Sequence, residues 1–225
     1  MLEEIAALID QAQLDGVILT APFTEDEAVR AMLKARQLPY VMISPAVVDA
    51  AVASASIDQA EAAQAMTAYL IANGHRRIGF VGGSERFVTS ARRLSGYRAA
   101  LDEAGISFDT TLVCSGDYDF ASGSKAADTL LALPIPPSAI FASSDDMAAG
   151  VLATAHRMGI NVPDQLSVAG FDNTDLAAVV WPPLTTISQP VRDLAYAAAD
   201  LLLSGKTDQL QLDFELVIRA SVGRG

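Results

Sequence analysis

Polar side chains able to bind a ligand or move a proton follow several short apolar runs of this sequence. Asp172 comes shortly after the apolar run Leu166–Ala169, and Ser144 comes shortly after the run Ala139–Ala142. A carboxylate at the end of a strand can accept hydrogen bonds from two hydroxyl groups, and each charge-assisted bond contributes about 1.5–3 kcal/mol. Asp172 is therefore the strongest single candidate for contact with a small polar molecule.

Residue types used for metal binding or nucleophilic catalysis are scarce. The histidines His75 and His156 lie far apart in the sequence, and Cys114 is its one cysteine. These residues cannot assemble a zinc site or a nucleophile triad. Two adjacent acids, Asp145 and Asp146, stand at the start of a predicted helix, where neighbouring side chains point in different directions. We expect Asp145 to be the N-cap of that helix rather than a metal ligand or an acid–base group.

The glycine-rich segment Gly79–Ser84 follows a strand pattern and could suggest a nucleotide-binding loop. It lacks the GxGxxG spacing and the GK[ST] ending with which such loops surround phosphates. A tight turn at the end of a strand explains this segment better. The sequence therefore predicts no cofactor and no enzyme activity, and an α/β enzyme that uses strand-end carboxylates is the weakest of three functional alternatives.

Composition limits the classes of protein further. Although 51% of the 225 residues are hydrophobic, no stretch approaches the ~18–20 continuous apolar residues of a membrane helix. The N-terminal sequence MLEEIAALIDQ is acidic and amphipathic, unlike the cationic start and apolar segment of a signal peptide. A single cysteine fits a reducing compartment. We expect a cytoplasmic protein with no membrane partner.

Charge argues against direct nucleic-acid binding by these residues. The formal net charge is −12. The densest basic cluster is only Arg86, Arg92, Arg93 and Arg98, around one predicted helix. Contacts to phosphate need clustered lysine and arginine, so a DNA-reading element would have to lie elsewhere.

Short apolar strands alternate with helical patterns along the whole chain. This alternation indicates βαβ units, in which helices cover both faces of a parallel sheet, and such sheets bind ligands outside the carboxyl ends of their strands. The expected strands are 17–19, 40–43, 54–57, 78–81, 112–115, 139–142, 166–169 and 214–218, and the expected helices are 2–12, 25–36, 58–74, 91–104, 122–131, 145–158 and 191–203. The strand ends carry the polar residues Thr20, Ser44, Gly82–Glu85, Gly116–Tyr118, Ser143–Asp146 and Gly170–Asn173.

Several segments resemble the effector-binding core of lactose-repressor (LacI) family transcription regulators. The segment Val168–Pro190, with its Gly-Phe-Asp and Leu-Thr-Thr-Ile-Ser-Gln-Pro sequences, is similar to the C-terminal signature of that core. Further similarity lies in GHRRIGFVGG at 74–83, in RLSGY at 93–97, in GDY at 116–118 and in FASSDDMAAG at 141–150. The resemblance covers essentially the whole chain and is best from Ser56 to Pro190.

The resemblance also implies which residues bind the effector. It places the Arg93 guanidinium and the Ser144 side chain in the effector cleft, Tyr118 as an aromatic wall against a ligand ring, and Asp172 at the mouth of the cleft. Ser44 stands where many relatives carry an effector-facing aspartate. From the residues alone, Arg93 could instead be a solvated arginine at a helix start, and Tyr118 could simply pack on its own loop.

In the family, the neighbourhood of the helix at 147–158 and of the Trp-Pro-Pro sequence lies at a dimer interface. By resemblance, we therefore expect a homodimer whose interface includes Met147, Val151 and Trp181.

The resemblance implies an α/β fold with two doubly wound parallel-sheet lobes, of the periplasmic-binding-protein-like type I. We expect residues 1–57 and 188–206 to form the N-terminal lobe, residues 58–187 and 207–225 to form the C-terminal lobe, and the effector cleft to lie between them. Compared with the family, the chain begins about where the second helix would. We therefore expect it to lack the DNA-binding headpiece and the start of the first lobe, which leaves that lobe truncated with exposed sheet edges.

The main functional interpretation is the small-molecule sensing core of a transcription regulator. A mono- or disaccharide would bind between the lobes, alter lobe and dimer geometry and thereby change operator binding. Operator DNA would be contacted only through a headpiece absent from these residues. The alternative is a periplasmic-type sugar-binding protein of a transport system, which shares the fold of the lobes but would need a signal peptide.

Overall fold

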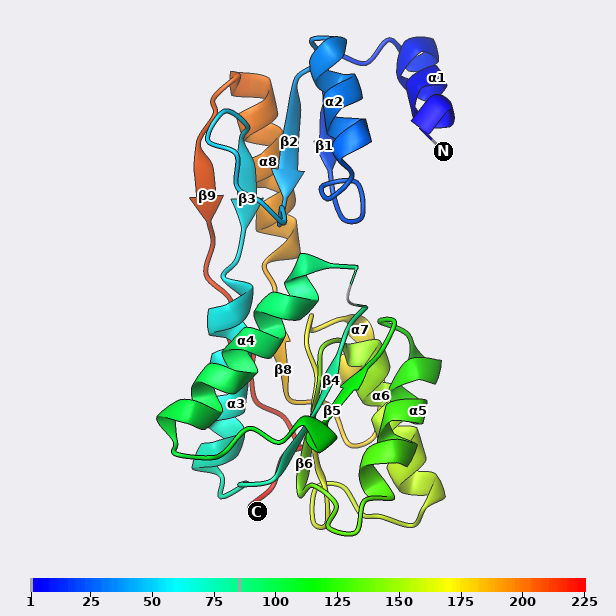
Figure 1. Ribbon diagram of the computed structural model, residues 1–225, viewed down its shortest axis with the longest axis vertical. Coiled ribbons are helices and arrows are strands. Elements are labelled where there is room, and N and C mark those ends of the chain that lie inside the picture. Colours follow the sequence, from blue (N-terminus) through cyan, green and yellow to red (C-terminus); the bar gives the residue numbers. More distant parts are fainter. Residues whose placement is uncertain (1, 85) are drawn as a thin grey trace. The chain divides into compact units, whose positions relative to one another are not determined.

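The computed structural model describes residues 2–84 and 86–225, so Glu85, expected among the strand-end residues, lies outside the described part. Contacts divide the chain into two units. Unit 1 comprises the residues up to Asp58 together with Pro190–Asp213, and unit 2 comprises Gln59–Gln189 with Phe214–Gly225. Each unit alternates strands and helices around a parallel sheet, which confirms the expected α/β fold (Figure 1).

The chain returns to unit 2 later than we expected. We had placed residues 207–225 in the C-terminal lobe, but unit 2 resumes only at Phe214. Strand β9 (Gln209–Gln211) pairs in parallel with β3 (Ser54–Ser56), and this pairing assigns the segment up to Asp213 to unit 1. No apolar alternation marks this segment as a strand, because all three residues of β9 are exposed.

Unit 1 contains a four-stranded parallel sheet in the order β1-β2-β3-β9. Successive side chains of a strand point to opposite faces, so Val41 and Met42 in β2 enter different hydrophobic clusters. Met42 packs with residues of α1 and α2, and Val41 packs with residues of α8. The remaining elements of unit 1 are α1 (Leu2–Ala12), β1 (Val17–Leu19), α2 (Glu27–Ala35), β2 (Tyr40–Ile43) and α8 (Val191–Ser204).

Unit 2 contains a second parallel sheet in the order β5-β4-β6-β7. The chain runs from β4 to β5 on one side and then crosses to β6 on the other, so the direction of winding reverses between β4 and β6. A reversal of this kind opens a crevice at the carboxyl ends of the two strands. The strands are β4 (Ile78–Gly82), β5 (Val113–Ser115), β6 (Ala139–Ala142) and β7 (Ser167–Ala169).

Helices cover both faces of this second sheet (Figure 1). The pair α3 and α4 packs together on one face, and the pair α5 and α6 packs together on the other. Their bounds are α3 (Gln59–Ala72), α4 (Val88–Glu103), α5 (Phe120–Leu131) and α6 (Asp145–Arg157), and a 3-10 turn η1 (Thr110–Leu112) precedes β5.

The C-terminal part of unit 2 completes the sheet beside β7. Strand β8 (Thr186–Ser188) pairs antiparallel with β10 (Glu215–Val217). Single bridges join Ala169 to Thr185 and Asp172 to Ser188, so β8 continues the sheet next to β7. The short helix α7 (Asp175–Val179) lies between β7 and β8 in sequence. We had expected a strand at 214–218 but had assigned none to 186–188.

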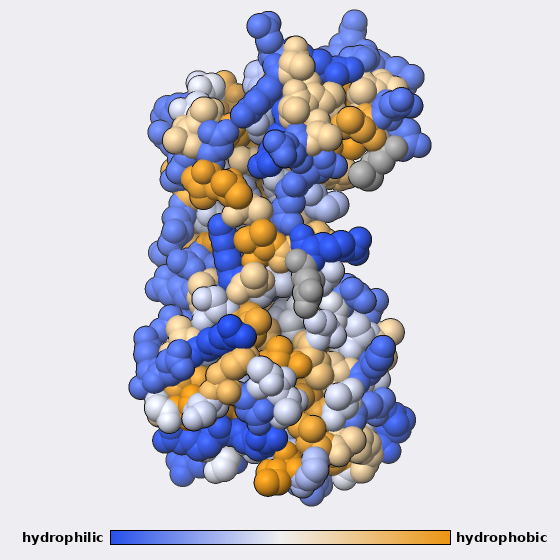
Figure 2. Space-filling model, viewed as in Figure 1, coloured by the Kyte–Doolittle hydropathy of each residue, from blue (hydrophilic) through white to orange (hydrophobic). Residues whose placement is uncertain are grey.

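On the face of unit 2 seen in Figure 2, hydrophobic residues form separate patches among hydrophilic ones. No helix within the described residues is both long enough and apolar enough to span a membrane.

Candidate functional site

A buried cation and a carboxylate meet in unit 2, close to the reversal in its sheet. Arg93 of α4 is 5% exposed, and its Nη2 atom lies 3.8 Å from Oδ1 of Asp172, which follows β7. The Asp172 side chain keeps 29% of its surface exposed. A buried charge is costly unless it is paired and hydrogen-bonded, so this ion pair is the most unusual polar feature of the unit.

The Arg93 guanidinium is held on several sides. It stacks on the ring of the buried Phe171, with Cζ 3.6 Å from the ring centroid. Its Nε donates a hydrogen bond to Oε1 of Gln59 at 2.8 Å, and its Nη1 donates to the backbone oxygen of Ser143. Burial lowers the pKa of Arg93, and the charge of Asp172 opposes that shift. A planar donor array fixed in this way can orient ligand oxygens with little further loss of side-chain freedom.

Asp172 sits in an unusual backbone conformation, with φ of 108°. Its backbone N donates to the oxygen of Ile187, and Nε2 of Gln189 donates to its Oδ1 at 2.6 Å. Burial raises the pKa of this carboxyl to about 6, although Arg93 and the Gln189 hydrogen bond pull it down. Asp172 therefore presents a partly exposed acceptor that a ligand hydroxyl can reach.

Tyr118 is a second aromatic residue near Arg93, with its ring centroid 6.0 Å from Cζ of Arg93. Its φ of 62° lies in the left-handed region, and its hydroxyl lies 2.6 Å from Oγ of Ser90 on α4. The ring lies directly over Gly83, where an added Cβ would come within 1.9 Å of the ring. The phenol is thus fixed by a hydrogen bond and a close backbone contact, and the ring of Phe87 lies 5.8 Å from it.

Ser144, and not Asp145, is the residue that caps α6. Ser144 is the N-cap of α6, because its Oγ accepts a hydrogen bond from the backbone N of Met147 at 3.2 Å. The prediction that Asp145 caps this helix is wrong. Asp145 is buried and accepts hydrogen bonds from Oγ1 of Thr186 and from the backbone N of Thr174, both at 2.7 Å. It therefore ties α6 to β8 and to the start of α7, and the contact of Ser144 with a ligand stays a prediction.

The remaining predicted residues fall outside this cluster. Ser44 belongs to unit 1, where it follows β2 with φ of 50°. Met147 and Val151 are fully buried inside unit 2, in the core that includes Ala127. They have no surface to offer a second subunit, so their assignment to a dimer interface is wrong. Trp181 is 89% exposed, and its interface role stays a prediction.

Three residues of the cluster were not predicted from the sequence as site residues. Gln59 and Gln189 bond to Arg93 and Asp172, and Phe171 supports the guanidinium. Only Phe171 carried a signal, since it stands inside the Gly-Phe-Asp sequence. The partners Gln59 and Gln189 are 130 positions apart, and no local pattern links residues so distant in sequence.

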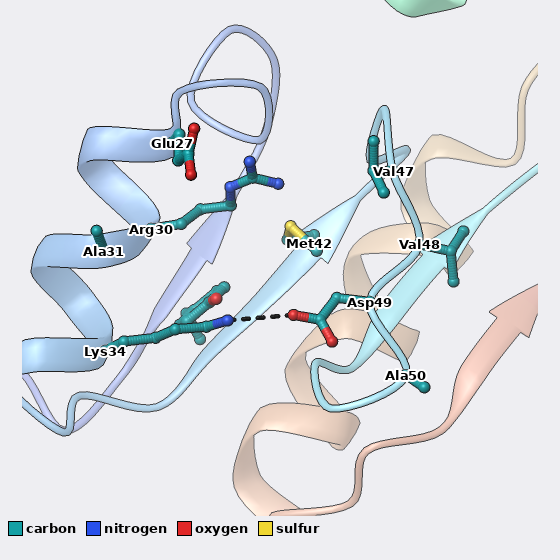
Figure 3. A pocket seen from close by; sticks show the side chains of 10 residues that line it. Glu27, Arg30, Ala31, Lys34, Met42, Val47, Val48, Asp49 and Ala50 are labelled. Carbon is teal, nitrogen blue, oxygen red and sulfur yellow. Dashed lines mark hydrogen bonds and ion pairs between the residues drawn. The ribbon is translucent and has the colours of Figure 1, made fainter.

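A large hollow lies in unit 1, and none of the residues of this cluster line it. It has a volume of about 590 Å³ and lies between α2 and the loop at 47–50, over Met42 (Figure 3). Arg30 and Lys34 extend from α2 toward that loop, and Lys34 forms an ion pair with Asp49 at 3.1 Å. Both side chains of this ion pair are exposed to solvent, so the pair contributes little to the stability of the fold. The buried charges of unit 2 are the stronger sign of a functional site.

Comparison with known proteins gives consistent matches. Residues 67–222 match the family described as "Periplasmic binding protein-like domain". The HTH-type transcriptional repressor CytR of Escherichia coli (strain K12) is 40% identical over 225 residues, which cover 95% of this chain and 64% of that protein. The ribose operon repressor of the same strain is 33% identical over 193 residues, 86% of this chain and 58% of that protein. This chain thus spans less than two thirds of the length of either relative.

Solved structures show the same likeness. The transcriptional regulator CelR–cellobiose complex has a TM-score of 0.88 and 32% sequence identity, with 98% of this chain and 69% of that chain covered. The transcription regulator CcpA of Lactococcus lactis also has a TM-score of 0.88, with 30% identity and with 98% of this chain and 83% of that chain covered.

Proposed function

This chain belongs to the periplasmic-binding-protein-like domains of lactose-repressor (LacI) family regulators, and we propose that it senses a sugar on behalf of a transcription repressor. The ligand would contact Arg93, Tyr118 and Asp172 of unit 2, with Ser144 and Ser44 as further predicted contacts. The observation that carries this proposal is the buried Arg93–Asp172 pair, whose carboxylate remains partly exposed beside a fixed aromatic ring.

The chemistry of the cluster favours an uncharged ligand with several hydroxyl groups. Arg93 and Asp172 already balance each other, so a charged ligand would leave one charge without a partner in a poorly hydrated place. Sugar hydroxyls can donate to the Asp172 carboxylate and accept from a guanidinium N–H. The CH face of the sugar ring can pack against Tyr118. The cellobiose bound in the related CelR structure supports this ligand class.

Regulation of transcription is proposed for the whole protein. The relatives CytR and the ribose operon repressor are named repressors, and the net charge of −12 makes these 225 residues poorly suited to bind DNA phosphates themselves. We propose that ligand binding changes the arrangement of the two units within a homodimer and so changes operator affinity. The coupling between the two sites would be reciprocal, as linkage requires.

A thermal-shift screen against mono- and disaccharides tests the sugar-binding proposal. A saturating sugar should raise the melting temperature of the wild type, since a ligand at 100 times its dissociation constant stabilises the folded state by about 2.7 kcal/mol. Asp172→Asn and Tyr118→Ala should lose the shift. Asp109→Asn should keep it, because Asp109 forms an ion pair with Arg77 elsewhere in unit 2.

Two results would count against the proposal. If no carbohydrate stabilises the wild type, the ligand class is wrong. If a sugar stabilises the wild type, Asp172→Asn and Tyr118→Ala equally, the site assignment is wrong.

A further inference from the structure

Two glutamines connect Arg93 to Asp172 by a second route, besides their direct ion pair. Arg93 Nε donates to Oε1 of Gln59 at 2.8 Å, and Gln59 Nε2 donates to Oε1 of Gln189 at 3.2 Å. Gln189 Nε2 then donates to Oδ1 of Asp172 at 2.6 Å. Every donor in this series points from the cation toward the anion, and hydrogen bonds aligned in one direction strengthen one another.

These two glutamines also occupy particular places in the chain. Gln59 and Gln189 are the first and last residues of the long segment of unit 2, while their neighbours Asp58 and Pro190 belong to unit 1. The hydrogen bond between the amides therefore joins two of the points where the chain leaves unit 2. Whatever restrains this amide pair also restrains those two crossings.

Burial indicates that the arrangement is specific. Gln59 is 2% exposed, although a primary amide is costly to bury unless its polar atoms are bonded. Its oxygen accepts from Arg93 and its nitrogen donates to Gln189, so both ends of the amide are used. This pattern fixes the orientation of the amide, since exchanging its O and N would place a donor against the Arg93 N–H.

We propose that the Gln59–Gln189 amide pair is a positioning relay. It holds Arg93 and Asp172 in place, and it transmits a change in the hydrogen bonding of the Asp172 carboxylate to two points where the chain leaves unit 2. A ligand hydroxyl that donates to Asp172 Oδ1 competes with Gln189 Nε2 for the same oxygen. When Gln189 is displaced, Gln59 loses its acceptor and its hold on Arg93 weakens. The ligand part of this inference rests on the proposed function, whereas the relay itself does not.

Protonation of Asp172 should change the hydrogen bonds of the amide pair in the absence of a ligand. A neutral carboxyl is a weaker acceptor than a carboxylate, so the Gln189 hydrogen bond weakens as Asp172 takes up its proton. Asp172 interacts electrostatically with Arg93 and with Asp145 and Asp146 at the start of α6. Arg93 in turn interacts with Tyr118 and Asp145, and Asp145 interacts with Arg219.

The experiment is an NMR pH titration of the ligand-free chain, which follows the side-chain amide signals of Gln59 and Gln189 and the Asp172 carboxyl carbon. We expect all three to titrate with one midpoint, near pH 6. In Gln189→Met, which keeps the length of the side chain but removes the amide, the Asp172 midpoint should move upward, because an acceptor of a hydrogen bond loses its donor. The Gln59 response should also disappear in this variant.

Gln64→Met is the matched control, since Gln64 lies on α3 together with Gln59 and forms a hydrogen bond with Glu103 at the surface. This variant should leave the titrations of Gln59 and Gln189 unchanged. A purely structural role for the pair would lower stability in Gln189→Met but would leave the Gln59 response in place. That result would overturn the relay, as would wild-type amides that do not follow the Asp172 midpoint.

The wild-type titration alone remains decisive if Gln189→Met fails to fold. Failure of the relay is also distinguishable from failure of the proposed function, because the titration contains no ligand. A carbohydrate screen without a hit would leave these titrations unaffected.

Discussion

At the scale of single residues, the energetics of the site centre on a carboxylate that is harder to ionise than usual. Burial raises the pKa of Asp172 to about 6, which exceeds the lowering by Arg93 and by the Gln189 hydrogen bond. Between pH 4 and 6 the folded protein keeps Asp172 protonated, while the unfolded chain ionises it. The folded state thus binds the additional proton, and its stability must fall as the pH rises through this window.

Asp172→Asn should flatten this part of the pH profile. A raised pKa of this size corresponds to about 3 kcal/mol of unfolding free energy that the wild type loses between pH 4 and 6 relative to the variant. Urea unfolding at pH 4, 5, 6 and 7 measures the difference in slope. Burial lowers the pKa of His75, which gives the opposite slope, but both proteins share that contribution.

Asp109→Asn serves as the control for this slope. Hydrogen bonds from Thr111 lower the pKa of Asp109, so its stabilising effect is lost only below its ordinary pKa. The variant should keep the wild-type slope between pH 4 and 6. Equal slopes in the wild type and Asp172→Asn would show that Asp172 ionises normally in the folded protein.

Short sequence motifs predict the charged residues of the site but not the side chains that hold them in place. Arg93, Tyr118 and Asp172 stand in recognisable short motifs, and the structure brings them together. Asp145 was misjudged because a carboxylate at a helix start usually caps the helix. Here Ser144 takes that place, and the carboxylate turns inward to Thr186. Such a choice depends on β8, which is distant in the sequence.

At the scale of elements, the position of Arg93 depends on how closely α4 packs against α3. Gly96 of α4 lies against the backbone of α3, where an added Cβ would come within 1.9 Å of the backbone oxygen of Ala60. Gln59, at the start of α3, can bond to Arg93 only if the helices approach this closely. The glycine is therefore required by contact between two helices.

Gly96→Ala should separate these helices and destabilise the protein. Overpacking against backbone typically costs 1–3 kcal/mol, which exceeds the gain of about 1 kcal/mol in helix propensity, so we expect a net loss of up to about 2 kcal/mol. Urea unfolding measures the loss. Ser95→Ala, at the exposed neighbouring position, should change stability by less than about 0.5 kcal/mol. A Gly96→Ala variant as stable as Ser95→Ala would show that the helices can adjust without cost.

Elements with a strong apolar or helical period were predicted closely, whereas the short pairing strands were not. The strands β4 and β6 and the helix α6 lie within a residue of their expected bounds. Strands β8 and β9 have three residues each, and all three residues of β9 are exposed. Their identity as strands comes from partners far along the chain, so single-sequence periodicity could not reveal them.

At the scale of the whole molecule, two copies of this chain repel each other because each carries a net charge of −12. Burial of exposed hydrophobic side chains at an interface can offset this repulsion. With Met147 and Val151 buried, the predicted interface is reduced to the segment after α6 that carries Val179 and Trp181. These side chains are 77% and 89% exposed. A tryptophan left in solvent gains more from burial at an interface than most residues, and tryptophan is enriched among the residues that dominate binding.

Trp181→Glu should convert the proposed homodimer into monomers. Loss of a central tryptophan costs at least about 2 kcal/mol of binding energy, which weakens dimerisation some thirtyfold or more, and the added charge increases the repulsion between subunits. Light scattering after size-exclusion chromatography, over a range of concentrations at moderate salt, measures the change in mass. Ile135→Glu is the matched control, because Ile135 is 69% exposed in unit 2 but lies outside the predicted interface. Dimers of equal strength in the wild type and Trp181→Glu would remove this segment from the interface, and equal disruption by Ile135→Glu would indicate a general effect of charge.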